Sequence, residues 1–202
     1  MTAPAATVMP GVRDRIVEAA AVITTESGWS AVTMNKVATR AGVSRQTVYN
    51  EVGSKPGLGQ AMVMRELERF LAAVEEELDR YDDLVAAIRS AAERILVMAR
   101  ENRLLDAVLA SAHGVSRGEA GSDNELLPFL TTDAAPLISA ATAVIAERLP
   151  VRFPDTALTD HEAEVAIDSV VRLVLSHVMQ PGSPPATVAD DIAWIVGRVV
   201  RP

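Results

Sequence analysis

The sequence predicts an all-α fold of about nine helices. Apolar side chains recur every three or four positions along almost the whole chain, which is the spacing of one helical face, and no alternating pattern indicates a strand. Glycine and proline interrupt this pattern, most clearly in QPGSPP at residues 180–185. With 202 residues, 49 % of them apolar and 23 % charged, the chain can bury a core in one or two domains.

The first three predicted helices are short and closely spaced. An apolar stripe begins at Val12 and ends near Gly28, which is a plausible C-terminal glycine. Thr33 can cap a second helix that stops at Gly42, and Ser44 can then cap a third. Two helices joined by so tight a turn cannot lie antiparallel, so they cross steeply, as in a helix-turn-helix.

The third helix exposes a row of hydrogen-bonding side chains. If Val48 faces inward, a helical wheel turns the polar residues of this segment outward or to the flanks, namely Arg45, Gln46, Thr47, Tyr49 and Asn50. Side chains of these types match base edges and phosphates in the DNA major groove. Helix N-termini at Thr33, Ser44 and Ser54 add backbone N–H groups suited to phosphate oxygens. The alternative interpretation is an ordinary polar surface helix.

The distribution of charge favours the N-terminal segment as the one that meets an anion. The net charge of −8 argues against a nucleic-acid partner for the chain as a whole. Residues 1–58, however, carry six Lys and Arg against four Asp and Glu, a net charge of +2, whereas residues 59–202 carry thirteen against twenty-three, a net charge of −10. This asymmetry points to residues 1–58.

Residues 55–200 are also predicted to be mainly helical. A polar, glycine-rich loop is predicted at 113–125, where the sequence is HGVSRGEAGSDNE. The periodicity predicts further helices at about 55–80, 83–101, 103–111, 125–149, 159–180 and 186–200. These helices are expected to form a second, larger helical part.

An ordered series of residues in the first part resembles the DNA-binding domain of the TetR family of bacterial transcriptional regulators. The resemblance covers about residues 10–60 and rests on Arg13-x-x-Ile16-Val17-x-Ala19-Ala20, Gly28, Ala31, Thr33, Val37-Ala38, Ala41-Gly42-Val43-Ser44, Thr47-Val48-Tyr49 and Ser54-Lys55-x-x-Leu58. It implies a helix-turn-helix DNA-binding domain at 10–55 and a ligand-binding and dimerisation domain at 56–202.

The resemblance also implies roles for individual side chains. Thr33, Tyr49 and Lys55 would contact phosphates, and Arg45, Gln46, Thr47 and Asn50 would face bases or phosphates, beside the helix start at Ser44. Family members often carry an aromatic or histidine pair after the tyrosine. This chain has Glu51-Val52 there, which puts a further phosphate contact at Glu51 in doubt.

The last two predicted helices carry more apolar surface than one protomer needs. Two apolar stripes run side by side along 163–179. In the final helix Ile192, Ile195 and Val199 are expected to face inward, while Trp194 lies off that face. The family resemblance favours a two-fold four-helix bundle over an interior helix of a monomer, with Val170, Val174, His177, Val178 and Trp194 in the interface.

The larger part is also expected to contain a ligand pocket. Candidate lining residues are Met62, Phe70, Met98, Leu105, Leu109, His113 and Phe129, with ordinary core packing as the alternative for each. The segments ELERFLAAVEEEL, LLPFLTT and RLVLSHVM resemble actinobacterial TetR-type regulators associated with alkane and fatty-acid metabolism. This resemblance implies a fatty acid or acyl derivative as effector, with His113 as a candidate for its polar end.

No constellation of catalytic residues is recognisable, so an enzyme is not expected. With no cysteine and three scattered histidines, neither a metal site nor a cofactor is predicted. The chain shows no membrane span and no signal peptide, and a cytoplasmic location is expected. The predicted function is a homodimeric repressor that binds a palindromic double-stranded DNA operator and responds to a small effector. The alternative is a helical binding or adaptor protein without specific DNA binding.

Overall fold

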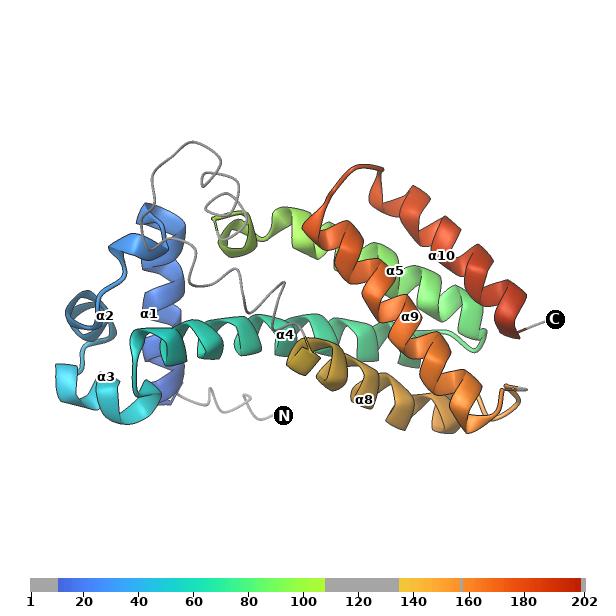
Figure 1. Cartoon of the computed structure of the whole chain (residues 1–202), viewed down its shortest axis with the longest axis horizontal. Coiled ribbons are helices and arrows are strands. Elements are labelled where there is room, and N and C mark those ends of the chain that lie inside the picture. The colour runs from blue at the N-terminus through green and yellow to red at the C-terminus, as the bar shows by residue number, and fades with distance from the viewer. Residues whose placement is uncertain (1–10, 108–134, 157, 201–202) are drawn as a thin grey trace, which may run out of the picture.

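A computed structural model describes residues 11–107, 135–156 and 158–200 of the chain. All regular structure among these residues is helical, which confirms the predicted all-α fold. The first helices of the chain form a head at one end, and the long helix α4 (Lys55–Arg80) runs from this head into a larger helical body (Figure 1). The helices are α1 (Val12–Ser27), the 3₁₀ helix η1 (Trp29–Ala31), α2 (Met34–Ala41), α3 (Arg45–Val52), α4 (Lys55–Arg80), α5 (Leu84–Glu101), α8 (Ala135–Arg152), α9 (Asp160–Met179) and α10 (Pro185–Val200).

Local capping interactions set the boundaries of the head helices. The hydroxyls of Thr33, Ser44 and Ser54 accept hydrogen bonds from backbone N–H groups in the first turns of α2, α3 and α4. Gly42 ends α2 in the left-handed conformation, with φ of 67°. These are the caps that the sequence predicts, because such signals depend only on neighbouring residues.

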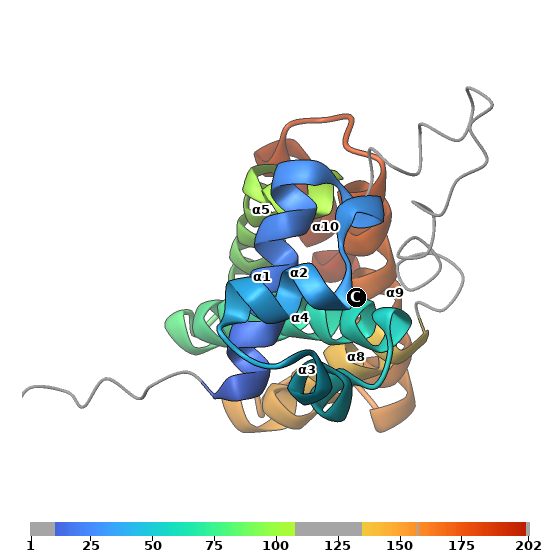
Figure 2. The same cartoon turned by 90° about the vertical axis from the view of Figure 1, so that its left-hand side faces the viewer.

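The head and the start of α4 share one apolar core. Trp29 is 1 % exposed, and it belongs to the same cluster as Ile16 and Val48. Leu58 and Met62 of α4 complete this cluster. Seen from the head end, α1, α2 and α3 lie across the near end of α4 (Figure 2). From Lys55 to Arg80, α4 is one unbroken helix, so a single element belongs both to the head core and to the body.

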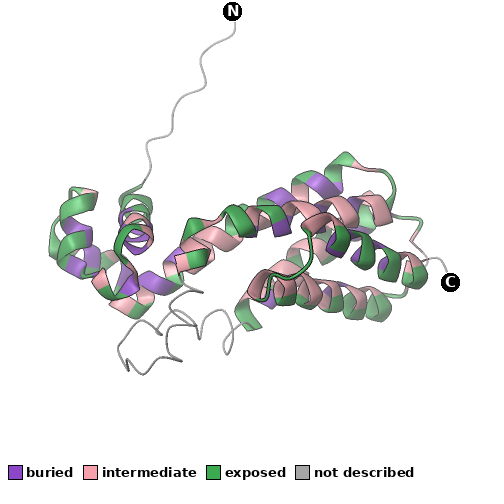
Figure 3. Cartoon of the chain, turned by 90° about the horizontal axis from the view of Figure 1, so that it is seen from above, coloured by how far each residue is buried: buried purple, intermediate pink, exposed green. Residues whose placement is uncertain are grey.

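In the body α4 packs against α5 and α8, α5 packs against α10, and α9 contacts α8, α5 and α10 (Figure 1). Buried residues occur both in the head and in the body (purple in Figure 3). The buried face of α10 consists of Val188, Ala189, Ile192, Ala193 and Val196, which pack against α5. Ile195 and Val199, which were also predicted to face inward, do not belong to this buried face; they line an apolar cavity in the body and are 40 % and 44 % exposed. Ala189 is fully buried on this face, and such small side chains let α10 pack closely on α5.

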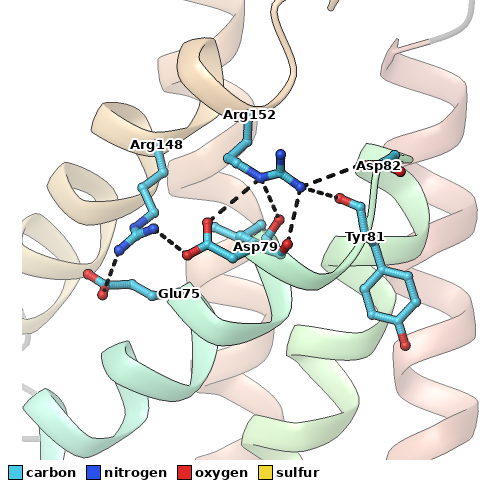
Figure 4. A network of polar contacts seen from close by, with 7 residues as sticks. Glu75, Asp79, Tyr81, Asp82, Arg148 and Arg152 are labelled. Atoms are coloured by element: carbon cyan, nitrogen blue, oxygen red, sulfur yellow. Dashed lines mark hydrogen bonds and ion pairs between the residues drawn. The ribbon is translucent and has the colours of Figure 1, made fainter.

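A network of ion pairs joins the C-terminal ends of α4 and α8 (Figure 4). Arg148 lies 2.9 Å from Glu75 and 2.7 Å from Asp79. Arg152 lies 3.7 Å from Asp79 and donates hydrogen bonds to the backbone carbonyls of Leu78, Asp79 and Tyr81. Because the two arginines contact both side chains and helix-end carbonyls, they fix the far end of α4 to α8.

A buried carboxylate links α4 to α5. Glu77 is 2 % exposed and accepts hydrogen bonds of 2.8 Å from both Ser90 and Arg94, with Arg80 at 3.1 Å. Burial alone would raise the pKa of Glu77, but the hydrogen bonds from Arg94 and Ser90 and the charges of Arg80 and Arg94 outweigh burial and lower that pKa. The stabilisation from Glu77 is therefore present above the pKa of an unfolded glutamate and is lost as pH falls through the lowered value.

Candidate nucleic-acid interface and ligand cavity

Helix α3 presents the polar face that the helical wheel predicts. Val48 is fully buried and Val52 is buried beside it, so these two residues hold α3 against the head. Arg45, Gln46, Tyr49 and Asn50 are exposed, and the last residue of the predicted row, Thr47, is half-buried. A short helix held by two valines can thus enter a groove with its polar side foremost.

The exposed side chains of α3 form two pairs, each four residues apart. Gln46 donates a hydrogen bond of 2.9 Å from Nε2 to Asn50 Oδ1. The guanidinium of Arg45 lies 5.3 Å from the centroid of the Tyr49 ring and donates a 3.2 Å hydrogen bond to its hydroxyl. Each pair still has unused donors and acceptors, so α3 offers a partly ordered hydrogen-bonding surface rather than free side chains.

The side chains predicted to meet phosphates border α3. Lys55 lies at the start of α4, with Nζ 4.9 Å from the centroid of the buried Trp29 ring. This cation–π contact anchors the Lys55 side chain to the head core. Thr33 and Ser44 use their hydroxyls as N-caps, which leaves other N–H groups of α2 and α3 at exposed helix ends.

Arg13 is a further residue beside this face. Its guanidinium donates a hydrogen bond to the backbone carbonyl of Glu51, so it joins the start of α1 to the last turn of α3. Arg13 is among the residues that carry the family resemblance, but no contact was predicted for it from the sequence. Glu51 itself is half-buried.

The body contains an elongated apolar cavity of about 630 Å³. It is lined by residues of α4, α5, α8, α9 and α10, and along α4 it extends from Met62 to Leu78. These residues are sixteen positions apart, which is about 24 Å at 1.5 Å per residue. The lining of the cavity is almost wholly aliphatic, so the cavity suits a long apolar molecule.

The structure places three of the predicted pocket residues in this cavity. Met62, Phe70 and Leu105 line it. Met98 instead lines a separate, more polar hollow of about 540 Å³ between α1 and the α4–α5 side of the body. The other three candidates, Leu109, His113 and Phe129, lie outside the described residues.

The residues predicted for the dimer interface lie in three different surroundings. Val170, Val174 and Val178 of α9 pack against the α5–α10 cluster and line the cavity of their own chain. His177 is half-buried at a small hollow near residues 181–183. Trp194 is 65 % exposed on the outer face of α10. The α9 valines were not predicted to line the cavity, because a cavity lining and a helix interface use the same residue types.

Within the described residues, no group of three or more histidine, aspartate or glutamate side chains is arranged to hold a metal ion. No helix in that part of the chain is long and apolar enough to cross a membrane.

A helix-turn-helix head joined through one long helix to a body with an apolar cavity defines a transcriptional regulator. Residues 16–62 match the family of bacterial regulatory proteins of the tetR type, and residues 83–198 match the C-terminal domain of bacterial tetracycline repressors. The chain belongs to the TetR family.

Individual relatives agree with this assignment. The transcriptional regulator AlkX of Mycobacterium tuberculosis is 34 % identical over 215 residues, covering 97 % of this chain and 94 % of AlkX. The TetR family repressor AlkX of Dietzia sp. strain DQ12-45-1b, which is implicated in biodegradation of n-alkanes, superposes with a TM-score of 0.74 at 26 % identity, over 94 % of this chain and 95 % of that one. FadR of Bacillus subtilis in complex with stearoyl-CoA shares the fold, with a TM-score of 0.54 and 13 % identity over 93 % and 97 % of the two chains.

Proposed function

We propose that this regulator is a homodimeric repressor that binds a palindromic operator and is released by a long apolar effector. The main support for this proposal is that α4 connects the DNA-binding head with the apolar cavity. Its first turns belong to the core of the head, and the helix then lines the apolar cavity as far as Leu78. A molecule that changes the position of α4 in the body changes the position of α3 at the same time.

In this proposal residues 10–55 are the DNA-binding unit and residues 56–202 the regulatory unit. Arg45, Gln46, Thr47 and Asn50 read bases, while Thr33, Ser44, Tyr49 and Lys55 position the head on phosphates. The exposure of the polar face of α3 and the anchoring of Lys55 on Trp29 support this division of roles. The relative from Dietzia is a repressor, which supports the direction of regulation.

The dimer is proposed to form through the outer faces of α9 and α10. Trp194 of α10 is 65 % exposed and does not line the cavity, whereas Ile195, Val199 and Val165 line it and are still 40 %, 44 % and 52 % exposed. A second copy that covers these side chains would remove apolar surface from water. It would also hold two α3 helices at a fixed separation, so the centres of two operator half-sites should lie about one helical turn, or a multiple, apart.

The effector is proposed to be a molecule with one long, saturated hydrocarbon chain, a class that includes the fatty acid or acyl derivative expected from the sequence. The elongated aliphatic cavity supports a long chain. The relative implicated in n-alkane biodegradation supports the same class of compound.

The DNA-binding part of the proposal is tested by separating base reading from phosphate positioning. Gln46→Ala and Arg45→Ala should each reduce discrimination by about 1–3 kcal/mol at particular base pairs of the operator. Lys55→Ala should weaken binding to all sequences alike and reduce the salt dependence of affinity. Affinities for a set of single-base operator variants, measured at several salt concentrations, distinguish these effects.

A change of preferred base in Lys55→Ala would contradict the proposed roles. Weak and equal binding of the wild type to all sequences, lost as the salt concentration rises, would favour the alternative of a helical adaptor protein that does not bind specific DNA.

A further inference from the structure

We propose that the polar end of the effector is a hydroxyl group, which forms hydrogen bonds with Glu66 and Asn102 at the head-side end of the cavity. The inference rests on the proposed function, in which a long apolar molecule fills the cavity. It adds the chemical class of that molecule, a long-chain alcohol, and the two residues that would select it.

Glu66 and Asn102 form a polar wall at one place in the apolar cavity. Glu66 lies on α4, and Asn102 follows the last residue of α5. Asn102 Nδ2 donates a 2.7 Å hydrogen bond to Glu66 Oε2, and the Glu66 side chain is only 15 % exposed. Both residues line the cavity and also the adjoining polar hollow, so they separate the two spaces.

The cations near this wall lie on its far side. Arg69 Nη1 contacts the two carboxylate oxygens of Glu66 at 3.2 Å and 3.1 Å, yet Arg69 lines the polar hollow and not the cavity. Arg65 likewise lines only the hollow and is paired with Glu18 of α1 at 2.5 Å. A molecule that enters along the cavity therefore meets the carboxylate of Glu66 before it meets either guanidinium.

The hydrogen-bonding capacity of the wall matches a hydroxyl group. A carboxylate such as Glu66 can only accept hydrogen bonds, whereas the amide of Asn102 keeps a second N–H to donate. The Asn102 oxygen already accepts from the backbone N–H of Leu105 at 3.0 Å. A hydroxyl can donate to Glu66 and accept from Asn102 at once.

Other end groups match this wall less well. A carboxylate offers no donor and places a like charge beside Glu66 in a largely desolvated site, which is unfavourable. A hydrocarbon end satisfies neither group of the wall and gains no hydrogen bond there. We therefore expect the cavity to bind an alcohol more tightly than either a fatty-acid anion or an alkane of equal length.

The opposite end of the cavity does not offer a comparable site. His161 and Glu162 line it at the start of α9, where both are exposed to water. Glu162 already takes part in the N-cap of α9, where it accepts hydrogen bonds of 2.8 Å from the backbone N–H and from the hydroxyl of Thr159. A polar group at that end would be solvated, so that end does not discriminate between an alcohol and an acid.

The test compares hexadecan-1-ol, hexadecanoate and hexadecane as effectors that release the intact dimer from operator DNA. Hexadecan-1-ol should act at a concentration at least about tenfold below that of hexadecanoate, a difference of about 1.4 kcal/mol. Glu66→Gln should remove that difference, because the neutral amide no longer repels a carboxylate. Glu68→Gln, an exposed position on the same helix, is the matched control and should keep the wild-type ratio.

The ratio of two effectors on one preparation is insensitive to a fraction of misfolded variant, so Glu66→Gln remains informative if it is less stable. Release by all three compounds with hexadecanoate equal to or better than the alcohol, or with a ratio unchanged in Glu66→Gln, overturns this inference and leaves the proposed function in place. Release by none of the three overturns both.

Discussion

Replacing Trp194 with aspartate should give a folded monomer whose affinity for operator DNA is at least about a hundredfold lower, a loss of about 2.8 kcal/mol. In the single chain Trp194 is 65 % exposed, and its ring faces the Arg198 guanidinium at 5.4 Å. An aspartate at this position is therefore solvated in the monomer and costs little folding free energy. In the proposed dimer the same aspartate would be removed from water, and pairing with Arg198 alone does not offset the cost of burying both charges.

Val151→Asp is the matched control for this prediction. Val151 is the most exposed large apolar side chain among the described residues, at 77 %, but it lies on α8 and outside the proposed interface. Light scattering should find Val151→Asp dimeric and Trp194→Asp monomeric, with thermal unfolding of each variant to verify its fold. A monomeric wild type at micromolar concentration, or a Trp194→Asp variant that stays dimeric, would contradict the proposed interface.

Gly57→Ala should destabilise the junction between the head and α4 by about 1–3 kcal/mol and weaken DNA binding with it. A Cβ added to Gly57 would lie 2.2 Å from the backbone carbonyl oxygen of Val52, the last residue of α3. Neither group is the tip of a flexible side chain, so α3 or the first turn of α4 must move. Val52 and Leu58 are both buried in the head core, so that movement disturbs their packing.

The same substitution at Gly197 provides the control. A Cβ at Gly197, which lies within α10, would meet the methyl groups of Val85 at 3.9 Å, an ordinary van der Waals distance. Gly197→Ala should therefore be tolerated, with a gain of up to about 1 kcal/mol from the higher helix propensity of alanine. Chemical denaturation measures both changes. Equal effects of the two substitutions would show that the close approach at Gly57 does not constrain the head.

The parts of the fold that depend on neighbouring residues were predictable from the sequence. Thr33, Ser44 and Ser54 act as caps, and Gly42 ends α2, because each uses only contacts within its own turn. The outward face of α3 followed from the position of one valine on a helical wheel.

The parts that depend on partner helices were not predictable. In α10 a stripe through Ile192 and Val196 and a stripe through Ile195 and Val199 are both possible helical faces, and only the approach of α5 selects the first. In the same way, the periodicity of α9 predicts that its valines are buried but does not say whether they face a cavity or a second chain. The contact of Glu66 with Asn102 joins residues 36 positions apart and leaves no local pattern to recognise.

In the proposed mechanism, an effector that fills the cavity in the body moves the DNA-binding head. Saturated effectors of increasing chain length, each carrying the same end group, should be titrated against the complex of dimer and operator, with release followed by fluorescence anisotropy. The concentration needed for release should fall as the chain lengthens, because each additional buried CH₂ contributes up to about 0.8 kcal/mol until the cavity is full. The same response at every chain length, or release by compact aromatic compounds alone, would contradict the claim.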